Sequence, residues 1–140
     1  MPNAMLTRRI TFAAAHRYRL PQWSDERNAE VFGTCANPHF HGHTYTCDVT
    51  VRGGIDETTG MIVDLGLLDR TLDAEVRARF DHRNINLDVP EFADGRLVPT
   101  GENLARFIFE RVQAALGERA KVTSVVVAEG DTLRTEFRGD

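Results

Sequence analysis

The chain has 140 residues and a formal net charge of −4, with 41% hydrophobic and 27% charged residues. These values are typical of a soluble globular protein, and we expect one domain over residues 1–140. The acidic balance argues against nucleic acid or a membrane surface as partner, because such binders normally carry a basic patch. No apolar stretch approaches the ~20 residues that span a bilayer. Two cysteines are too few for a disulfide scaffold, and the start shows no signal-peptide pattern, so we expect a cytoplasmic protein.

Two strands are predicted in the first part of the chain. Apolar residues alternate over Leu6–His16, which places His16 at the end of the apolar face. Residues 17–40 contain several Gly and Pro breaks and are expected to form a long, functional or mobile loop. A second alternating run covers residues 41–52. If the two strands pair, their apolar faces coincide.

Two helices are predicted next. Asp64 is a plausible N-cap, and apolar residues follow at helical spacing as far as Phe80. Thr100 is a second N-cap candidate, and the apolar stripe that follows it ends at Gly117, a natural helix stop. Both helices have one apolar face to bury.

Two further strands are predicted at Val122–Glu129 and Leu133–Phe137, joined by a turn at Gly130-Asp131. The element order is therefore ββααββ. Strand pairs that bracket two helices indicate an α+β domain, with an antiparallel sheet and the helices on one of its faces.

Three histidines are candidate metal ligands. Residues two apart on a strand point the same way, so His41 and His43 share a face on either side of Gly42. His16 would converge on them if the strands pair, and three histidines with an open fourth position are typical of a catalytic zinc site. The alternative is that they are polar residues satisfied at the edge of a core. His39 has the same parity and could replace one of the pair, although Pro38 favours reading it as a loop residue.

Cys35 precedes His41 by six residues and could serve as nucleophile or general base, since a thiol near a divalent cation has a lowered pKa. The alternative is an ordinary loop cysteine. Cys47 lies among apolar strand residues and is expected in the core. Asp81 and His82 follow the first helix and are either a helix-ending turn or part of a base and relay system with a thiol.

Glu129 ends an apolar strand. Its carboxylate is either exposed at the strand end or directed into a pocket, where it is the right acceptor for the paired N–H groups of a guanine-like or pterin edge. The residues alone leave both readings open.

Taken together, the motifs resemble the 6-pyruvoyl-tetrahydropterin synthase and 6-carboxytetrahydropterin synthase family over roughly residues 6–137. The motifs that carry the resemblance are Phe12-x3-His16, Cys35-x5-His41-Gly42-His43, Asp81-His82-x-Asn84, Pro99-Thr100-x-Glu102-Asn103 and a late strand that ends in Glu129.

This resemblance implies a tunnelling fold: a four-stranded antiparallel sheet with two helices, assembled as a homo-oligomer. Trimers would form a twelve-stranded barrel, two trimers would stack into a hexamer, and sites would lie between subunits. The implied substrate is a small-molecule pterin, 7,8-dihydroneopterin triphosphate. The reaction eliminates triphosphate with an internal redox change of the side chain, so that Zn2+ is the only cofactor needed.

The resemblance also implies roles for individual residues. The zinc ligands would be His16, His41 and His43. Cys35 would be the general base, tuned by Asp81 and His82 from a neighbouring subunit. The residues of the pterin pocket would be Glu129, Thr100 and Glu102.

Three other functions remain open at this stage. The five residues between Cys35 and His41 favour the pyruvoyl type over the carboxy type, in which three are more common. The alternative register, with His39 and His41 as the pair, would give three but lacks the glycine between them. A non-catalytic zinc- or pterin-binding module on the same fold is a second alternative. A zinc hydrolase is disfavoured because no Glu lies beside the histidines as in HExxH.

Overall fold

Five strands form one sheet in the order β3-β1-β2-β4-β5 in the computed structural model, which describes residues 2–140. The strands are β1 (Asn3–His16), β2 (His41–Gly54), β3 (Arg83–Asn84), β4 (Lys121–Glu129) and β5 (Arg134–Phe137). The helices are α1 (Asp25–Phe32), α2 (Leu65–Leu72), α3 (Ala78–Phe80), α4 (Ile85–Asp88) and α5 (Gly101–Leu116).

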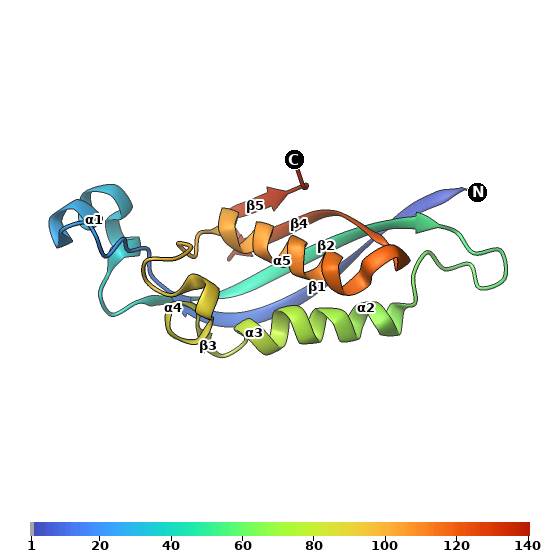
Figure 1. Cartoon of the computed structure of the whole chain (residues 1–140), viewed down its shortest axis with the longest axis horizontal. Coiled ribbons are helices and arrows are strands. Elements are labelled where there is room, and N and C mark those ends of the chain that lie inside the picture. Colours follow the sequence, from blue (N-terminus) through green and yellow to red (C-terminus); the bar gives the residue numbers. More distant parts are fainter. Residues whose placement is uncertain (1) are drawn as a thin grey trace.

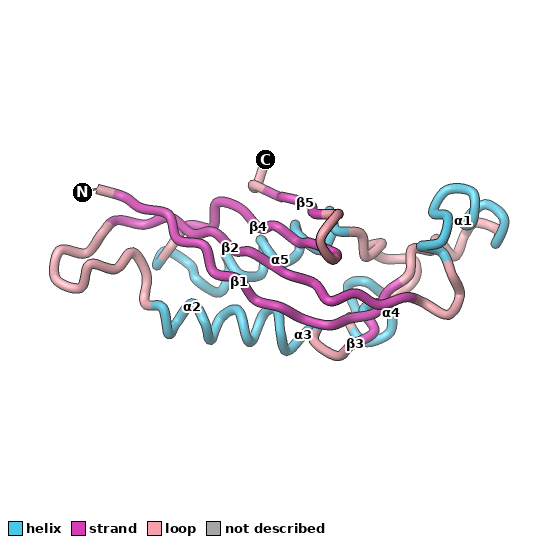
Figure 2. The backbone as a smooth tube through the Cα atoms, turned by 180° about the vertical axis from the view of Figure 1, so that it is seen from behind, coloured by secondary structure: helices cyan, strands magenta, loops and turns pink. Residues whose placement is uncertain are grey.

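The two predicted helices are confirmed, and both cover the same face of the sheet (Figure 1). A π-helical turn, Asp73–Arg77, joins α2 to α3, so the segment up to Phe80 is helical throughout. Seen from behind, the strands lie in front of the helices, which leaves the other face of the sheet without a helical cover (Figure 2). The fold is therefore α+β, as the element order predicts.

The predicted four-stranded antiparallel sheet is wrong in detail, because β3 adds a short parallel strand beside β1. The cause is the turn after α3. The Asp81 carboxylate accepts a hydrogen bond from the Ala13 backbone N–H at 2.9 Å, and the His82 N–H donates to the Ala13 carbonyl at 2.6 Å. Because of both contacts, Arg83 and Asn84 lie along the edge of β1.

The long loop predicted over residues 17–40 is also wrong in part, because it contains α1 and a 3-10 turn at Gly33–Ala36. The Ser24 hydroxyl caps α1 by accepting from the Arg27 N–H at 3.1 Å. Only Asn28 of this helix is buried, so α1 has no apolar stripe that a periodicity argument could detect.

Both long helices begin at the predicted caps. The Asp64 side chain accepts backbone N–H groups at the start of α2, and the Thr100 hydroxyl does the same at α5. Gly117 ends α5 with a φ of 58°. Among residues 2–140, no helix is both long and apolar enough to cross a membrane.

The core lies between the sheet and its helices. Its largest fully buried apolar side chains are Phe12, Tyr45, Phe80, Phe92, Leu68, Leu72, Ile85, Leu104, Ile108 and Leu116.

Candidate metal centre and active site

Three histidines meet at the end of the sheet where β1 stops and β2 starts. The antiparallel ladder pairs His16 with His41 and Ala14 with His43, so the alternation of side chains puts all three imidazoles on the helix-covered face. One ring nitrogen from each lies within 4.8 Å of the others. A tetrahedral zinc with bonds of ~2.0–2.1 Å would need roughly 3.3 Å between its nitrogen ligands. Small side-chain movements thus suffice to close the site around an ion.

His16 is oriented by the protein. Its ring is fully buried, and its Nδ1–H donates to the Pro99 carbonyl at 2.8 Å, which leaves Nε2 as the lone-pair nitrogen. The Tyr45 hydroxyl lies beside the ring, 3.1 Å from Nδ1 and 3.2 Å from Nε2. Burial lowers the pKa of His16 to about 4, so the imidazole is neutral at neutral pH. A neutral ring with one nitrogen fixed by a carbonyl is the form that binds metals.

His41 and His43 each keep a nitrogen without a partner. His41 Nδ1 and His43 Nε2 are buried and accept or donate no hydrogen bond among the described residues. Burial lowers the pKa of both rings, which keeps them neutral. Buried orphan nitrogens are rare because they lose hydration without compensation. Three neutral imidazoles, two of which have a nitrogen without a hydrogen-bond partner, therefore fit a transition-metal ion well.

Glu129 borders the histidine cluster from the end of β4. Its side chain is only 9% exposed, and Oε2 lies 3.6 Å from His43 Nε2, which is too long for a hydrogen bond. Oε1 is buried and has no hydrogen-bond partner within residues 2–140. Burial raises the pKa of Glu129, and the charge of Glu102 raises it further. The structure thus directs the carboxylate into the site, as the pocket reading predicts, with a free acceptor.

Tyr18 belongs to the same site and was not among the residues expected from the sequence. Its ring lies edge-on to His16 with centroids 5.2 Å apart, and it is close enough to Glu129 for each group to shift the pKa of the other. Burial and the charge of Glu129 raise the pKa of Tyr18, so the hydroxyl stays protonated. The available signal was its position two residues after the candidate ligand His16.

Cys35 reaches the site through the 3-10 turn that follows α1. The Tyr18 backbone N–H donates to the Cys35 carbonyl at 2.8 Å, which holds the turn against the end of β1. Burial and the charge of Glu129 raise the pKa of Cys35, whereas a lowered pKa was expected beside a cation. Both causes disfavour the charged thiolate, which is the opposite of the effect that a cation has. Cys47 is fully buried in the core, as predicted.

The segment before α5 forms another wall of the site. Pro99 supplies the carbonyl that binds His16, and Thr100 caps the helix. Glu102 is exposed, and its charge acts on both Glu129 and Tyr18. A side chain at Gly101 would collide with the Thr135 hydroxyl, its Cβ lying 2.7 Å from that oxygen, so the glycine allows α5 to approach β5.

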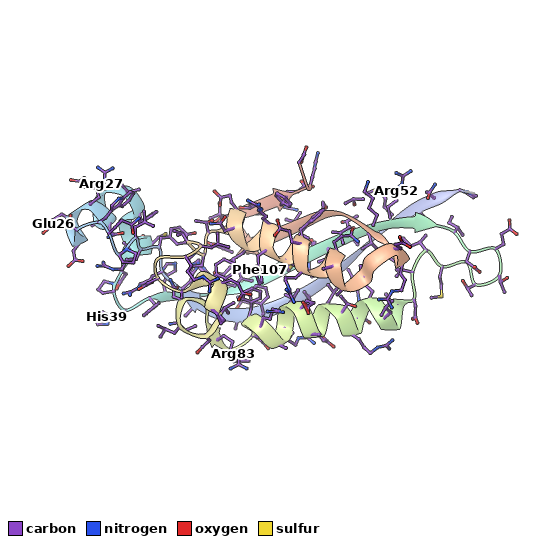
Figure 3. All side chains as sticks on the ribbon, viewed as in Figure 1. Glu26, Arg27, His39, Arg52, Arg83 and Phe107 are labelled. Carbon is purple, nitrogen blue, oxygen red and sulfur yellow. The ribbon has the colours of Figure 1, made fainter. Side chains whose placement is uncertain are left out.

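Asp81 and His82 lie at the outer edge of β1, where they bind the Ala13 backbone. The His82 side chain is 85% exposed, and its Nε2 lies 3.9 Å from the Asp81 carboxylate. Arg83, the next residue, points away from the sheet (Figure 3). Within one chain the His82 ring faces outward, whereas the Asp81 carboxylate is partly buried and bound to the Ala13 N–H.

His39 is exposed and points out from the loop (Figure 3). The candidate metal cluster contains His16, His41 and His43 and does not include it. The histidine pair is therefore the one that flanks Gly42.

Comparison with known proteins bears on the meaning of this cluster. The family model described as 6-pyruvoyl tetrahydropterin synthase matches residues 5–140. The chain is 43% identical over 138 residues to the human protein named 6-pyruvoyl tetrahydrobiopterin synthase, covering 99% of this chain and 93% of the relative. It is 41% identical over 138 residues to the Drosophila melanogaster protein of that name, covering 99% and 81%.

The chain belongs to the 6-pyruvoyl tetrahydropterin synthase family. Its fold agrees with the solved structure of the Caenorhabditis elegans 6-pyruvoyl tetrahydropterin synthase at a TM-score of 0.93 and 34% identity, covering 100% of this chain and 98% of the other. The resemblance inferred from the sequence motifs is thereby confirmed. The histidine cluster, Cys35 and Glu129 are consequently candidates for the chemistry of a family enzyme.

Proposed function

We propose that this protein is a zinc-dependent lyase of the 6-pyruvoyl-tetrahydropterin synthase type that acts on 7,8-dihydroneopterin triphosphate. The observation that carries the proposal is the meeting of three neutral histidines, a free carboxylate and a thiol at one end of the sheet. Family membership supports lyase activity on a pterin.

His16, His41 and His43 would hold the metal. Neutral imidazole ligands suit zinc, and three of them leave a position open for substrate. When bound, the ion supplies a Lewis acid that withdraws electron density from the side-chain oxygens of the substrate and so acidifies the adjacent C–H bonds. Pro99 contributes by fixing the tautomer of His16.

Cys35 would be the general base that moves protons between the side-chain carbons. The thiolate is the active form, yet burial and Glu129 raise the pKa of this thiol within one chain. A positive charge nearby would favour the thiolate. Protonated His82 of a neighbouring copy is one source of such charge, and the metal ion is another. Asp81 would orient that imidazole.

Glu129 would anchor the pterin ring. A carboxylate with a free buried oxygen accepts paired N–H groups, which a pterin presents on its guanidine-like edge. Thr100 and Glu102 would line the same pocket. Because an apolar enclosure strengthens hydrogen bonds to charge, the low exposure of Glu129 favours a strong contact.

Assembly is part of the proposal. The outward position of the His82 ring supports a homo-oligomer, a trimer or a hexamer of the tunnelling fold, in which sites lie between subunits. The cytoplasmic location expected from the composition stays a prediction.

The alternative product is 6-carboxy-5,6,7,8-tetrahydropterin from the same substrate. Five residues separate Cys35 from His41, and exposed His39 does not join the metal cluster, so the three-residue register finds no support in the geometry. A non-catalytic zinc- or pterin-binding module is a further alternative. Such a module would not need the Cys35 thiol.

The deciding experiment is mass spectrometry of the products that zinc-loaded protein forms from 7,8-dihydroneopterin triphosphate. We expect a pyruvoyl pterin and free triphosphate. A carboxypterin with a released two-carbon fragment would identify the sister activity. Zinc binding without release of triphosphate would support the binding module.

A further inference from the structure

Arg17 directly follows metal ligand His16, and its backbone is fixed by a buried side chain. The Arg17 N–H donates to Asn86 Oδ1 at 2.9 Å, and Asn86 Nδ2 donates to the Arg17 carbonyl at 3.0 Å. Asn86 is only 5% exposed. One amide thus satisfies both backbone groups immediately beyond the last residue of β1, where no strand partner remains.

The Arg17 guanidinium contacts Phe40 and Asp94, and its buried Nε has no hydrogen-bond partner among residues 2–140. Its Cζ lies 4.7 Å from the centroid of the Phe40 ring, within the range of a cation–π contact. Nη2 donates to the Asp94 carboxylate at 3.1 Å, and the Arg17 side chain is 18% exposed. Partial burial strengthens both contacts because water screens them less.

Phe40 directly precedes metal ligand His41 and has an unusual backbone. Its φ is 66°, a left-handed conformation that bulky residues rarely adopt. The Phe40 N–H donates to the Asn37 carbonyl at 3.0 Å, which closes a turn before β2. A residue kept in this conformation needs compensating contacts, and the stack on Arg17 is one of them.

These two residues occupy equivalent places on the two strands. His16 and His41 form the last pair of the β1–β2 ladder, and Arg17 and Phe40 are the next residues outward. We propose that the contact between Arg17 and Phe40, the clasp, is a positioning device that sets the separation of His16 and His41 for metal binding. This inference rests on the proposed function, because it assigns the clasp to the proposed metal site.

A purely structural role makes a different prediction from a positioning role. An ion pair and stack that only stabilise the fold would change the free energy of unfolding and leave metal affinity unaltered. A clasp that sets ligand separation would change metal affinity in protein that is still fully folded. Groups that orient metal ligands typically alter affinity by roughly 10- to 100-fold when removed.

The test is a titration of the metal-free full-length protein with Co2+, followed by the visible absorption of the bound ion. We expect Arg17→Gln to bind Co2+ roughly 10- to 100-fold more weakly and with an altered spectrum. Arg19→Gln is the matched control, since Arg19 pairs with Asp25 at 2.9 Å and is remote from Phe40 in its contacts. The control should bind Co2+ as the wild type does. Urea unfolding of each metal-free variant shows whether it is folded.

Variants at Phe40 and a milder change at Arg17 test whether metal binding depends on the Phe40 ring or only on its backbone conformation. Phe40→Gly suits the left-handed conformation but removes the ring, so we expect weaker Co2+ binding, whereas Phe40→Tyr should bind normally. Arg17→Lys keeps the charge beside Asp94 without a planar stack and should fall between wild type and Arg17→Gln. Unchanged affinity in folded Arg17→Gln or in Phe40→Gly would overturn the clasp while leaving the metal site intact. A wild type that binds no Co2+ would overturn the metal site and the clasp together.

Discussion

The Glu129→Gln variant tests two effects of the buried carboxylate: its effect on the stability of the metal-free fold and its contribution to pterin binding. Burial, followed by the charge of Glu102, raises the pKa of Glu129, although His41 and Tyr18 partly oppose this. A carboxyl whose folded pKa is raised contributes stability below its unfolded pKa and loses that contribution as the pH rises through the folded pKa. At neutral pH the ionised group therefore destabilises the metal-free fold. Gln has nearly the same shape and no charge.

We expect the variant to unfold at the same or a higher urea concentration than the wild type at pH 7, yet to bind pterin more weakly. Hydrogen bonds to a charged group contribute about 1.5–3 kcal/mol, which corresponds to roughly 10- to 150-fold in affinity. The Gln side chain has one acceptor oxygen, and its NH2 group cannot accept the second pterin N–H. The loss should therefore lie at the upper end of this range.

Two measurements check the reasoning: urea unfolding of metal-free protein, and the dissociation constant of a pterin product followed by its fluorescence. Glu136→Gln is the control, because Glu136 of β5 is paired with Arg138. This variant should bind pterin normally. Marked destabilisation of Glu129→Gln with unchanged pterin affinity would refute the argument. It would mean that the carboxylate supports the fold and does not recognise the ligand.

Three further outcomes are expected. Cys35→Ala should bind one zinc per chain but release no triphosphate; full turnover in a product assay would remove Cys35 from the mechanism. Burial lowers the folded pKa of His16 from 6.5 to about 4, so the unfolded chain binds the additional proton between these values. The free energy of unfolding of metal-free protein should then fall as the pH drops from 6.5 to 4, and a His16→Gln variant should show a flatter pH profile. Leu104→Ala empties a fully buried position in α5 and should cost about 2–5 kcal/mol in urea unfolding; a cost below about 1 kcal/mol would mean that the core closes around the cavity.

Local rules were sufficient for the elements that obey a simple period. The alternation that ends at His16 and the alternation that begins at His41 are set by side-chain geometry within each strand. Asp64 and Thr100 cap their helices through oxygens that reach only two or three residues ahead. Because these interactions are local, the sequence was enough to predict them.

Elements held by distant partners escaped prediction. β3 exists because Asp81 and His82 bind the backbone of Ala13, a contact between residues 68 apart in the case of Asp81. α1 buries a single polar residue and therefore lacks the apolar stripe that reveals a helix. Neither effect leaves a periodic pattern in the chain.

The same distinction between local and long-range interactions applies to the candidate site. The sequence by itself determined that His41 and His43 share a face, because two residues on one strand must do so. It also supplied the motifs that identify the family. Only the tertiary structure decided that His16 pairs with His41, that Tyr18 and Glu129 meet beside them, and that Arg17 stacks on Phe40. Side-chain alternation is fixed by the backbone of one strand, whereas these meetings depend on the register between segments that are far apart in the chain.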